Sequence, residues 1–102
     1  MKKQTTGNLE IGNFLREKRW AAEKSQGDVS KEFGYASPQF VSNWERGISH
    51  PPHAEIRELA KFYNCNPEEF CEQYLQIMLR AYEKEMRKEL MPKRKAQEKK
   101  AA

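Results

Sequence analysis

The chain has 102 residues, 37% hydrophobic and 33% charged, which allows one compact domain with a small core. Aromatic residues make up 11%, which favours a packed core over disorder. No apolar run approaches the ~18–20 residues of a membrane span, and no apolar stretch follows the first lysines, as a secretory signal requires. We therefore expect a cytoplasmic protein with no membrane contact, in which Cys65 and Cys71 are reduced thiols.

Charge is distributed unevenly along the chain. Residues 1–75 carry 10 Lys/Arg and 11 Asp/Glu, a net charge of −1, whereas residues 76–102 carry 9 and 4, a net charge of +5. The basic character therefore lies in the last quarter of the chain. Bulk charge gives no support for nucleic-acid binding by the first 75 residues, so such a function has to rest on local features.

Helix signals dominate the first half of the chain, and no segment alternates apolar and polar residues as a strand does. Residues 1–8 are expected to be flexible. A first helix follows, and its apolar residues are Leu9, Ile11, Phe14, Leu15 and Trp20. Ser25 lies three residues before Asp28, a variant of the capping box that predicts the start of a second helix. Gly34 ends that helix, with Val29 and Phe33 on its buried face.

Three further helices are predicted downstream. Ser37-Pro38 is an N-cap followed by an N1 proline, so a third helix begins there and ends at Gly47. Pro51-Pro52 starts a fourth helix, and Asn66-Pro67 starts a fifth. The expected core residues of these three helices are Val41, Trp44, Ile56, Leu59, Ala60, Tyr63, Phe70, Tyr74 and Ile77.

The helical pattern continues past Ile77 to Leu90, and Pro92 then opposes further helix. A second apolar stripe lies on a different face of this segment: Leu75, Leu79, Tyr82, Met86 and Leu90. The stripe can fold back on the domain, pair with the same stripe of another chain, or stay solvated. Its heptad-like spacing favours dimerisation. Residues 92–102 are basic and poor in apolar residues, and we expect them to be disordered.

Two short helices joined by a Gly-containing turn, the second closed by Trp44-Glu45-Arg46-Gly47, resemble the phage-repressor helix-turn-helix family (Cro/lambda-repressor, or xenobiotic-response-element type). The resemblance covers roughly residues 9–75. It implies an all-α, five-helix DNA-binding domain, to which the helical pattern after Ile77 adds residues 76–91 as an extension and possible dimerisation element. It also implies that the helix at about 26–33 crosses the DNA backbone while the helix at about 38–46 enters the major groove.

The resemblance further implies a bacterial or phage-encoded regulator of transcription that binds double-stranded DNA sequence-specifically. We expect a repressor that acts as a homodimer on a two-fold symmetric operator, because two half-sites one helical turn apart need a two-fold protein. Two alternatives stay open. One is an antitoxin-type regulator that binds a partner protein through its C-terminal helix. The other is a protein-interaction module that has lost DNA binding, for which the near-neutral charge of residues 1–75 is the best argument.

The family pattern assigns base contacts to Gln39 and Asn43, which lie at i, i+4 on one side of the third helix. Their amides can pair bidentately with adenine. The flanking Phe40 and Ser42 are also expected to contact bases, and Phe40 could meet the methyl group of a thymine. Arg19 and Glu45 match a structural ion pair between the first helix and the end of the third. The residues assigned to DNA phosphates are Gln26, Ser37, Arg46, Ser49 and His50.

The sequence departs from the family pattern at three places. The turn Gly34-Tyr35-Ala36-Ser37 is one residue longer than usual, which can change the pitch of the third helix in the groove. Glu23-Lys24 replaces the common glycine and apolar residue between the first two helices. Pro38 stands where the first base-reading residue often lies, and it offers no side-chain hydrogen bond. These departures bear on the base contacts rather than on the fold.

Catalytic and metal sites are not indicated. His50, His53, Cys65 and Cys71 include metal-ligand types, but their spacing matches no usual zinc finger. No catalytic triad, phosphate-cradling glycine loop or catalytic carboxylate pair is apparent. We therefore expect no enzymatic activity, no metal and no cofactor.

Overall fold

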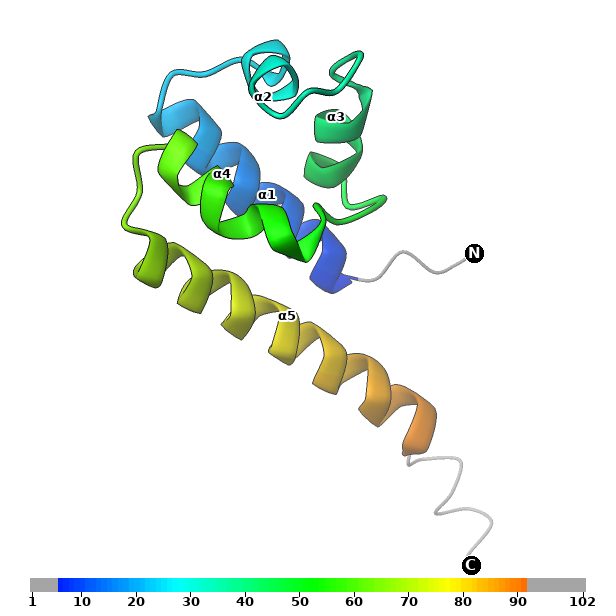
Figure 1. Ribbon diagram of the computed structural model, residues 1–102. Coiled ribbons are helices and arrows are strands. Elements are labelled where there is room, and N and C mark those ends of the chain that lie inside the picture. The colour runs from blue at the N-terminus through cyan, green and yellow to red at the C-terminus, as the bar shows by residue number, and fades with distance from the viewer. Residues whose placement is uncertain (1–5, 92–102) are drawn as a thin grey trace, which may run out of the picture.

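The computed structural model describes residues 6–91, and every regular element in that range is a helix (Figure 1). The elements are α1 (Thr6–Ala21), α2 (Gln26–Glu32), α3 (Gln39–Glu45), the 3-10 turn η1 (His53–Glu55), α4 (Ile56–Phe62) and α5 (Pro67–Leu90). The predicted all-α, five-helix fold is confirmed. Residues 1–5 and 92–102, where flexible and disordered segments were expected, lie outside the described residues.

Several helix boundaries differ from the expected ones. Residues 6–8 belong to α1 rather than to a flexible segment. Helix α3 begins at Gln39, one residue late, because Pro38 itself occupies the N-cap position and offers no side-chain cap. The fourth helix begins at Ile56 and not at the proline pair, because Pro52 has an extended ψ of 139° and η1 intervenes.

The core lies between α1, α4 and α5, with α2 and α3 closing its other side (Figure 1). Its buried residues include most of those expected from periodicity, and the expected Phe14, Phe33 and Ile77 are partly buried against them. The buried apolar residues are Ile11, Leu15, Val29, Val41, Trp44, Ile56, Leu59, Ala60, Tyr63, Phe70 and Tyr74. Leu9 and Trp20 were wrongly grouped with this face. They are 49% and 60% exposed, because both lie about 160–180° around α1 from Ile11 at 100° per residue.

The first four α-helices end in the same way. The third residue after each helix donates its N–H to a carbonyl five residues back, and a residue of positive φ precedes the donor, as in the Schellman motif. Glycine takes that position after α2 and α3, at Gly34 and Gly47, both with φ of 77°. Glu23 takes it after α1 with φ of 57°, and Asn64 takes it after α4 with φ of 59°. Sharp, fully bonded ends explain how so many helices fit into about 70 residues.

Helix α5 is a single continuous helix of 24 residues. Asn66 caps it by accepting a hydrogen bond from the Glu69 N–H at 2.9 Å, with Pro67 in the first turn, as predicted. Its first half packs on α1 and α4, and its second half extends past the body of the domain (Figure 1). The expected boundary between residues 75 and 76 therefore has no break in structure, and Ile77 and Met78 still pack against the core.

Candidate nucleic-acid interface

Helix α2, the following turn and α3 form the helix-turn-helix. Ser25 and Asp28 make the predicted capping box at the start of α2: the Ser25 hydroxyl accepts from the Asp28 N–H at 2.9 Å, and the Asp28 carboxylate accepts from the Ser25 N–H at 2.8 Å. The Ser25 hydrogen bonds lower the pKa of Asp28. Val41 and Trp44 bury the inner face of α3. The opposite face of α3 is therefore turned away from the core.

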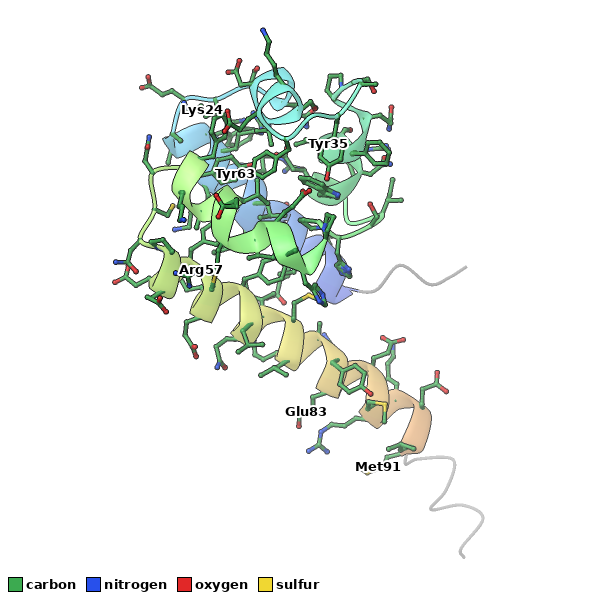
Figure 2. All side chains as sticks on the ribbon, in the orientation of Figure 1. Lys24, Tyr35, Arg57, Tyr63, Glu83 and Met91 are labelled. Atoms are coloured by element: carbon green, nitrogen blue, oxygen red, sulfur yellow. The ribbon has the colours of Figure 1, made fainter. Side chains whose placement is uncertain are left out.

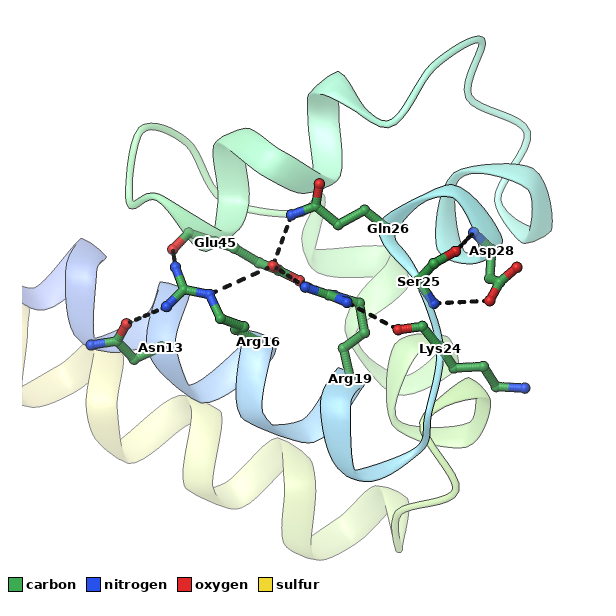
Figure 3. Close-up of polar contacts among 8 residues, drawn as sticks. All are labelled: Asn13, Arg16, Arg19, Lys24, Ser25, Gln26, Asp28 and Glu45. Atoms are coloured by element: carbon green, nitrogen blue, oxygen red, sulfur yellow. Dashed lines mark hydrogen bonds and ion pairs between the residues drawn. The ribbon is translucent and has the colours of Figure 1, made fainter.

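An ion pair between α1 and the end of α3 fixes the orientation of α3 (Figure 3). The Arg19 guanidinium donates to both carboxylate oxygens of Glu45, at 2.6 and 2.8 Å, and both side chains are buried. A third donor of Arg19 reaches the Lys24 carbonyl oxygen at 2.9 Å. The hydrogen bond to Glu45 raises the pKa of Arg19 despite burial. A bidentate pair of this kind fixes geometry as well as charge.

Gln26 and Arg16 also donate hydrogen bonds to Glu45. The Gln26 amide donates to the Glu45 carboxylate at 2.9 Å. Arg16 donates to the Glu45 backbone carbonyl at 3.0 Å and to the Asn13 side chain at 3.3 Å (Figure 3). An amide nitrogen carries two hydrogens, so the Gln26 amide nitrogen keeps one for another acceptor.

Four side chains on the outer face of α3 form a connected polar row. The Asn43 carbonyl oxygen accepts from the Gln39 amide at 2.9 Å and from the Arg46 guanidinium at 3.0 Å. Arg46 also donates to the Ser42 hydroxyl at 3.3 Å. Gln39 and Arg46 are exposed and the other two half-buried. The expected base-reading residues are therefore adjacent in space and accessible.

Phe40 lies at the edge of this row and is 52% exposed. Its ring packs against Tyr35, with centroids 5.1 Å apart, and Tyr35 packs edge-on against the buried Trp44 at 5.7 Å. Figure 2 shows Tyr35 beside α3. Phe40 therefore both packs against the turn before α3 and keeps half of its surface free.

Four of the five residues assigned to phosphates flank α3, and the fifth, Gln26, begins α2. Ser37 is exposed, and its hydroxyl accepts from the Gln39 N–H at 3.3 Å. Ser49 and His50 are half-buried in the segment that follows Arg46. Burial, and then the neighbouring His53, lower the pKa of His50 from its ordinary value, which favours the neutral imidazole. A neutral imidazole can still donate a hydrogen bond to an anion.

The stripe expected on α5 lies at the surface. Leu75, Leu79, Tyr82 and Leu90 are 48–67% exposed, and Met86 is half-buried. The stripe faces away from the Phe70 and Tyr74 side that packs on the core. Within residues 6–91 these side chains therefore have no apolar core to enter.

The sequence reasoning missed Gly12, Arg16 and the partners of Tyr35. Gly12 is buried where α1 meets the end of α3, and a Cβ there would overlap the Glu45 carbonyl oxygen. Arg16 lies one helical turn before Arg19 on α1. This i, i+3 spacing could have predicted that both arginines lie on the side of α1 that faces α3. Tyr35 donates from its hydroxyl to Glu55 at 2.7 Å. That hydrogen bond joins residues 20 positions apart, so no local sequence pattern predicts it.

The described residues contain neither a cluster of metal-ligand types nor a membrane-spanning helix. Among the described residues, no three His, Cys, Asp or Glu side chains gather as metal ligands would. No helix in residues 6–91 is long and apolar enough to cross a membrane.

One of the comparisons with known proteins identifies a protein family. No curated protein and no solved structure matches this chain. A family model described as Helix-turn-helix matches residues 15–70, more than half of the chain. The matched segment runs from α1 to the start of α5 and contains the Arg19–Glu45 pair and all of α3. The chain therefore belongs to the Cro/C1-type helix-turn-helix family of DNA-binding regulators.

Proposed function

We propose that this chain binds a specific duplex-DNA sequence through the outer face of α3, acts as a homodimer, and represses transcription by occupying a promoter. The observation that carries the proposal is the solvent-accessible polar row opposite the core face of α3, which contains Gln39, Ser42, Asn43 and Arg46. Membership of a DNA-binding family supports DNA as the partner. An α-helix fits the major groove, where base edges differ most.

The row has the chemistry that base edges require. Gln39 and Asn43 each offer a donor and an acceptor, which suits adenine N6 and N7. Their mutual hydrogen bond of 2.9 Å holds the two amides side by side before DNA arrives. Ser42 adds a hydroxyl donor and Phe40 an apolar surface. We assign Arg46 to the DNA backbone because it lies at the end of α3.

The other backbone contacts are proposed on both sides of this row. Ser37, Ser49 and His50 keep polar groups at or near the surface. Gln26 is shared between Glu45 and a phosphate, since one of its amide hydrogens already reaches the carboxylate at 2.9 Å. These contacts set the register on the duplex and carry little sequence information.

Selection of bound sequences from random duplex DNA tests this interface. The full chain should enrich a two-fold symmetric site. Gln39→Ala and Asn43→Ala should each relax the preference at specific positions, at a cost of ~1–3 kcal/mol per lost base pairing. Gln73→Ala, which removes an exposed amide from α5, serves as the matched control and should bind like the wild type. An equal loss on all DNA sequences would contradict base reading, and no enrichment would favour the protein-interaction alternative.

The proposed dimer interface is the α5 stripe of Leu75, Leu79, Tyr82, Met86 and Leu90. These side chains repeat at heptad-like spacing over about 22 Å of helix. The second half of α5 extends past the domain (Figure 1), and a helix that lacks tertiary packing is marginal in water. Pairing with a second copy would bury the stripe and supply the two-fold symmetry that a symmetric operator needs.

Leu79→Glu tests the interface, with Lys84→Glu on the opposite side of α5 as its control. Sedimentation should show a dimer for the wild type and Lys84→Glu, and a monomer for Leu79→Glu. The monomer should lose affinity for the symmetric site. A wild-type chain that stays monomeric at high concentration would exclude the homodimer and favour a different protein partner on α5, as in the antitoxin-type alternative.

The repressor role has its own test. A promoter that contains the selected site should give less transcript in vitro as the protein is added. Repression then follows from occupancy alone and requires no second activity. An increase in transcript would make the protein an activator and would leave the DNA-binding proposal intact.

A further inference from the structure

Tyr35 connects three parts of the molecule. Its backbone N–H donates to the Ser30 carbonyl oxygen at 2.8 Å and so closes α2. Its hydroxyl donates to the Glu55 carboxylate at 2.7 Å, and its ring packs against both Phe40 and Trp44. The turn between α2 and α3 is therefore anchored by the side chain of one of its own residues.

The hydrogen bond between Tyr35 and Glu55 ties the turn before α3 to the segment after it, since Glu55 ends η1. Both residues are half-buried. Burial first, and then the hydrogen bond to Glu55, raise the pKa of Tyr35 to about 12. The hydroxyl therefore stays protonated and donates its hydrogen bond throughout the neutral range.

The anchored ring packs against Phe40. The Tyr35 and Phe40 rings are tilted by 40° with centroids 5.1 Å apart. Tyr35 also packs edge-on against Trp44, whose exposed fraction is only 3%. Phe40, 52% exposed and next to Gln39, is thus the most exposed ring of a cluster of three that begins in the core. Contact with the Tyr35 ring favours the Phe40 rotamers that preserve it.

We infer that Tyr35 is a positioning residue of the DNA-reading surface: anchored by Glu55, it holds Phe40 against the C5-methyl group of a thymine beside the bases read by Gln39 and Asn43. This inference rests on the proposed function. The thymine methyl is the distinctive apolar feature among base edges in the major groove. Polar side chains of α3 match the polar edges, and a supported aromatic ring matches the methyl.

Thymine-to-deoxyuridine substitution in the selected DNA site tests the contact, because deoxyuridine lacks only the C5-methyl group. The full wild-type chain should lose about fourfold in affinity at one thymine of each half-site, the effect expected for burying one methyl-sized group. Phe40→Ala should show no penalty at that thymine. A full penalty in Phe40→Ala overturns the inference.

Tyr35→Phe and Glu55→Ala test the positioning, because both keep Phe40. Each should reduce the deoxyuridine penalty to less than about twofold. The double variant should show no further reduction, because the two substitutions remove the same hydrogen bond between Tyr35 and Glu55. Glu55→Gln retains an acceptor oxygen and should preserve the penalty. Glu58→Ala, at an exposed position on α4, is the control and should also preserve it.

A role of Tyr35 in stability alone would weaken binding to all duplexes alike and leave the ratio of thymine to deoxyuridine affinities unchanged. An unchanged ratio in Tyr35→Phe therefore overturns the inference while the proposed function stands. If the wild-type chain selects no DNA site at all, the proposed function fails and the inference fails with it.

Discussion

Two backbone positions decide how α1 meets its neighbours. Gly12 is buried against the end of α3, where a Cβ would overlap the Glu45 carbonyl oxygen and lie 2.8 Å from its carbonyl carbon. Glu23 lies just after α1 with φ of 57°, a conformation that favours glycine. Position 12 therefore has the glycine that its geometry requires, whereas position 23 has a glutamate where glycine would fit better.

Gly12→Ala should destabilise the fold strongly, because the new methyl meets backbone that cannot rotate away. We expect a loss near the upper end of the roughly 1–3 kcal/mol of overpacking, and a Tm lower by roughly 10 °C or more. Gly27→Ala is the matched control, since a Cβ there meets only the Ser25 hydroxyl at 3.6 Å. An unchanged Tm for Gly12→Ala would mean that α1 can move away from α3 at little cost.

Glu23→Gly should stabilise the protein by about 0.5–1 kcal/mol. It relieves a left-handed conformation that costs an L-residue roughly 1–2 kcal/mol, and part of this gain is offset because glycine makes the unfolded chain more flexible. Urea denaturation measures the change. Glu23→Ala keeps the left-handed penalty and should bring no comparable gain. Equal effects of the two substitutions would argue against backbone strain at this position.

At the scale of elements, the orientation of α3 relative to α1 and α2 depends more on a few buried hydrogen bonds than on the burial of apolar side chains. Helix α3 has seven residues and packs by Val41 and Trp44, an inner face that allows some rotation. The Glu45 carboxylate receives donors from Arg19 on α1 and Gln26 on α2, so it links three helices at one point. Hydrogen bonds of fixed direction remove the freedom that apolar contacts leave.

Glu45→Ala should lower the free energy of unfolding by ~3–5 kcal/mol, because it leaves the Arg19 guanidinium buried without its partner. The loss should shrink when Arg19→Ala is added, since no stranded charge then remains. Glu58→Ala removes an exposed carboxylate paired with Lys61 at 3.4 Å, and its cost should stay below about 1 kcal/mol. Chemical denaturation of these three variants distinguishes a buried pair from a surface pair.

At the scale of the whole molecule, charge and shape divide the chain into two parts. The helix-turn-helix lies within residues 1–75, which carry a net charge of −1, while residues 76–102 carry +5. Helix α5 leads from the first part to the second (Figure 1). If DNA is the partner, few cations of the domain itself neutralise phosphates, and the end of the chain supplies additional ones.

Removal of residues 92–102, which contain five Lys/Arg and one Glu, should therefore weaken the salt dependence of DNA binding. The slope of log K against log salt is about −0.9 per neutralised phosphate, so its magnitude should fall by up to about 4 for each chain. Preference among DNA sequences should not change, because base contacts lie on α3. A fluorescence titration at several salt concentrations measures both quantities, and an unchanged slope would show that these residues do not contact DNA.

Local signals made much of the fold predictable. Capping at Ser25 and Asn66, termination at Gly34 and Gly47, and apolar periodicity along the chain express interactions within a few residues, which a sequence displays directly. The same signals misled where two faces of one helix are both apolar. Trp20 had the right residue type for a core and lies on the wrong side of α1.

The helices, the inner face of α3 and the Arg19–Glu45 match could be predicted from the sequence, because they depend on spacing and on a family motif. Three further facts emerge only once the chain has folded: Gly12 must lack a side chain, Gln26 donates to Glu45, and Tyr35 reaches Glu55. Each of them concerns which group lies opposite another in the folded chain. Close packing brings together residues 19 to 33 positions apart, and such pairing leaves no periodic pattern along the sequence.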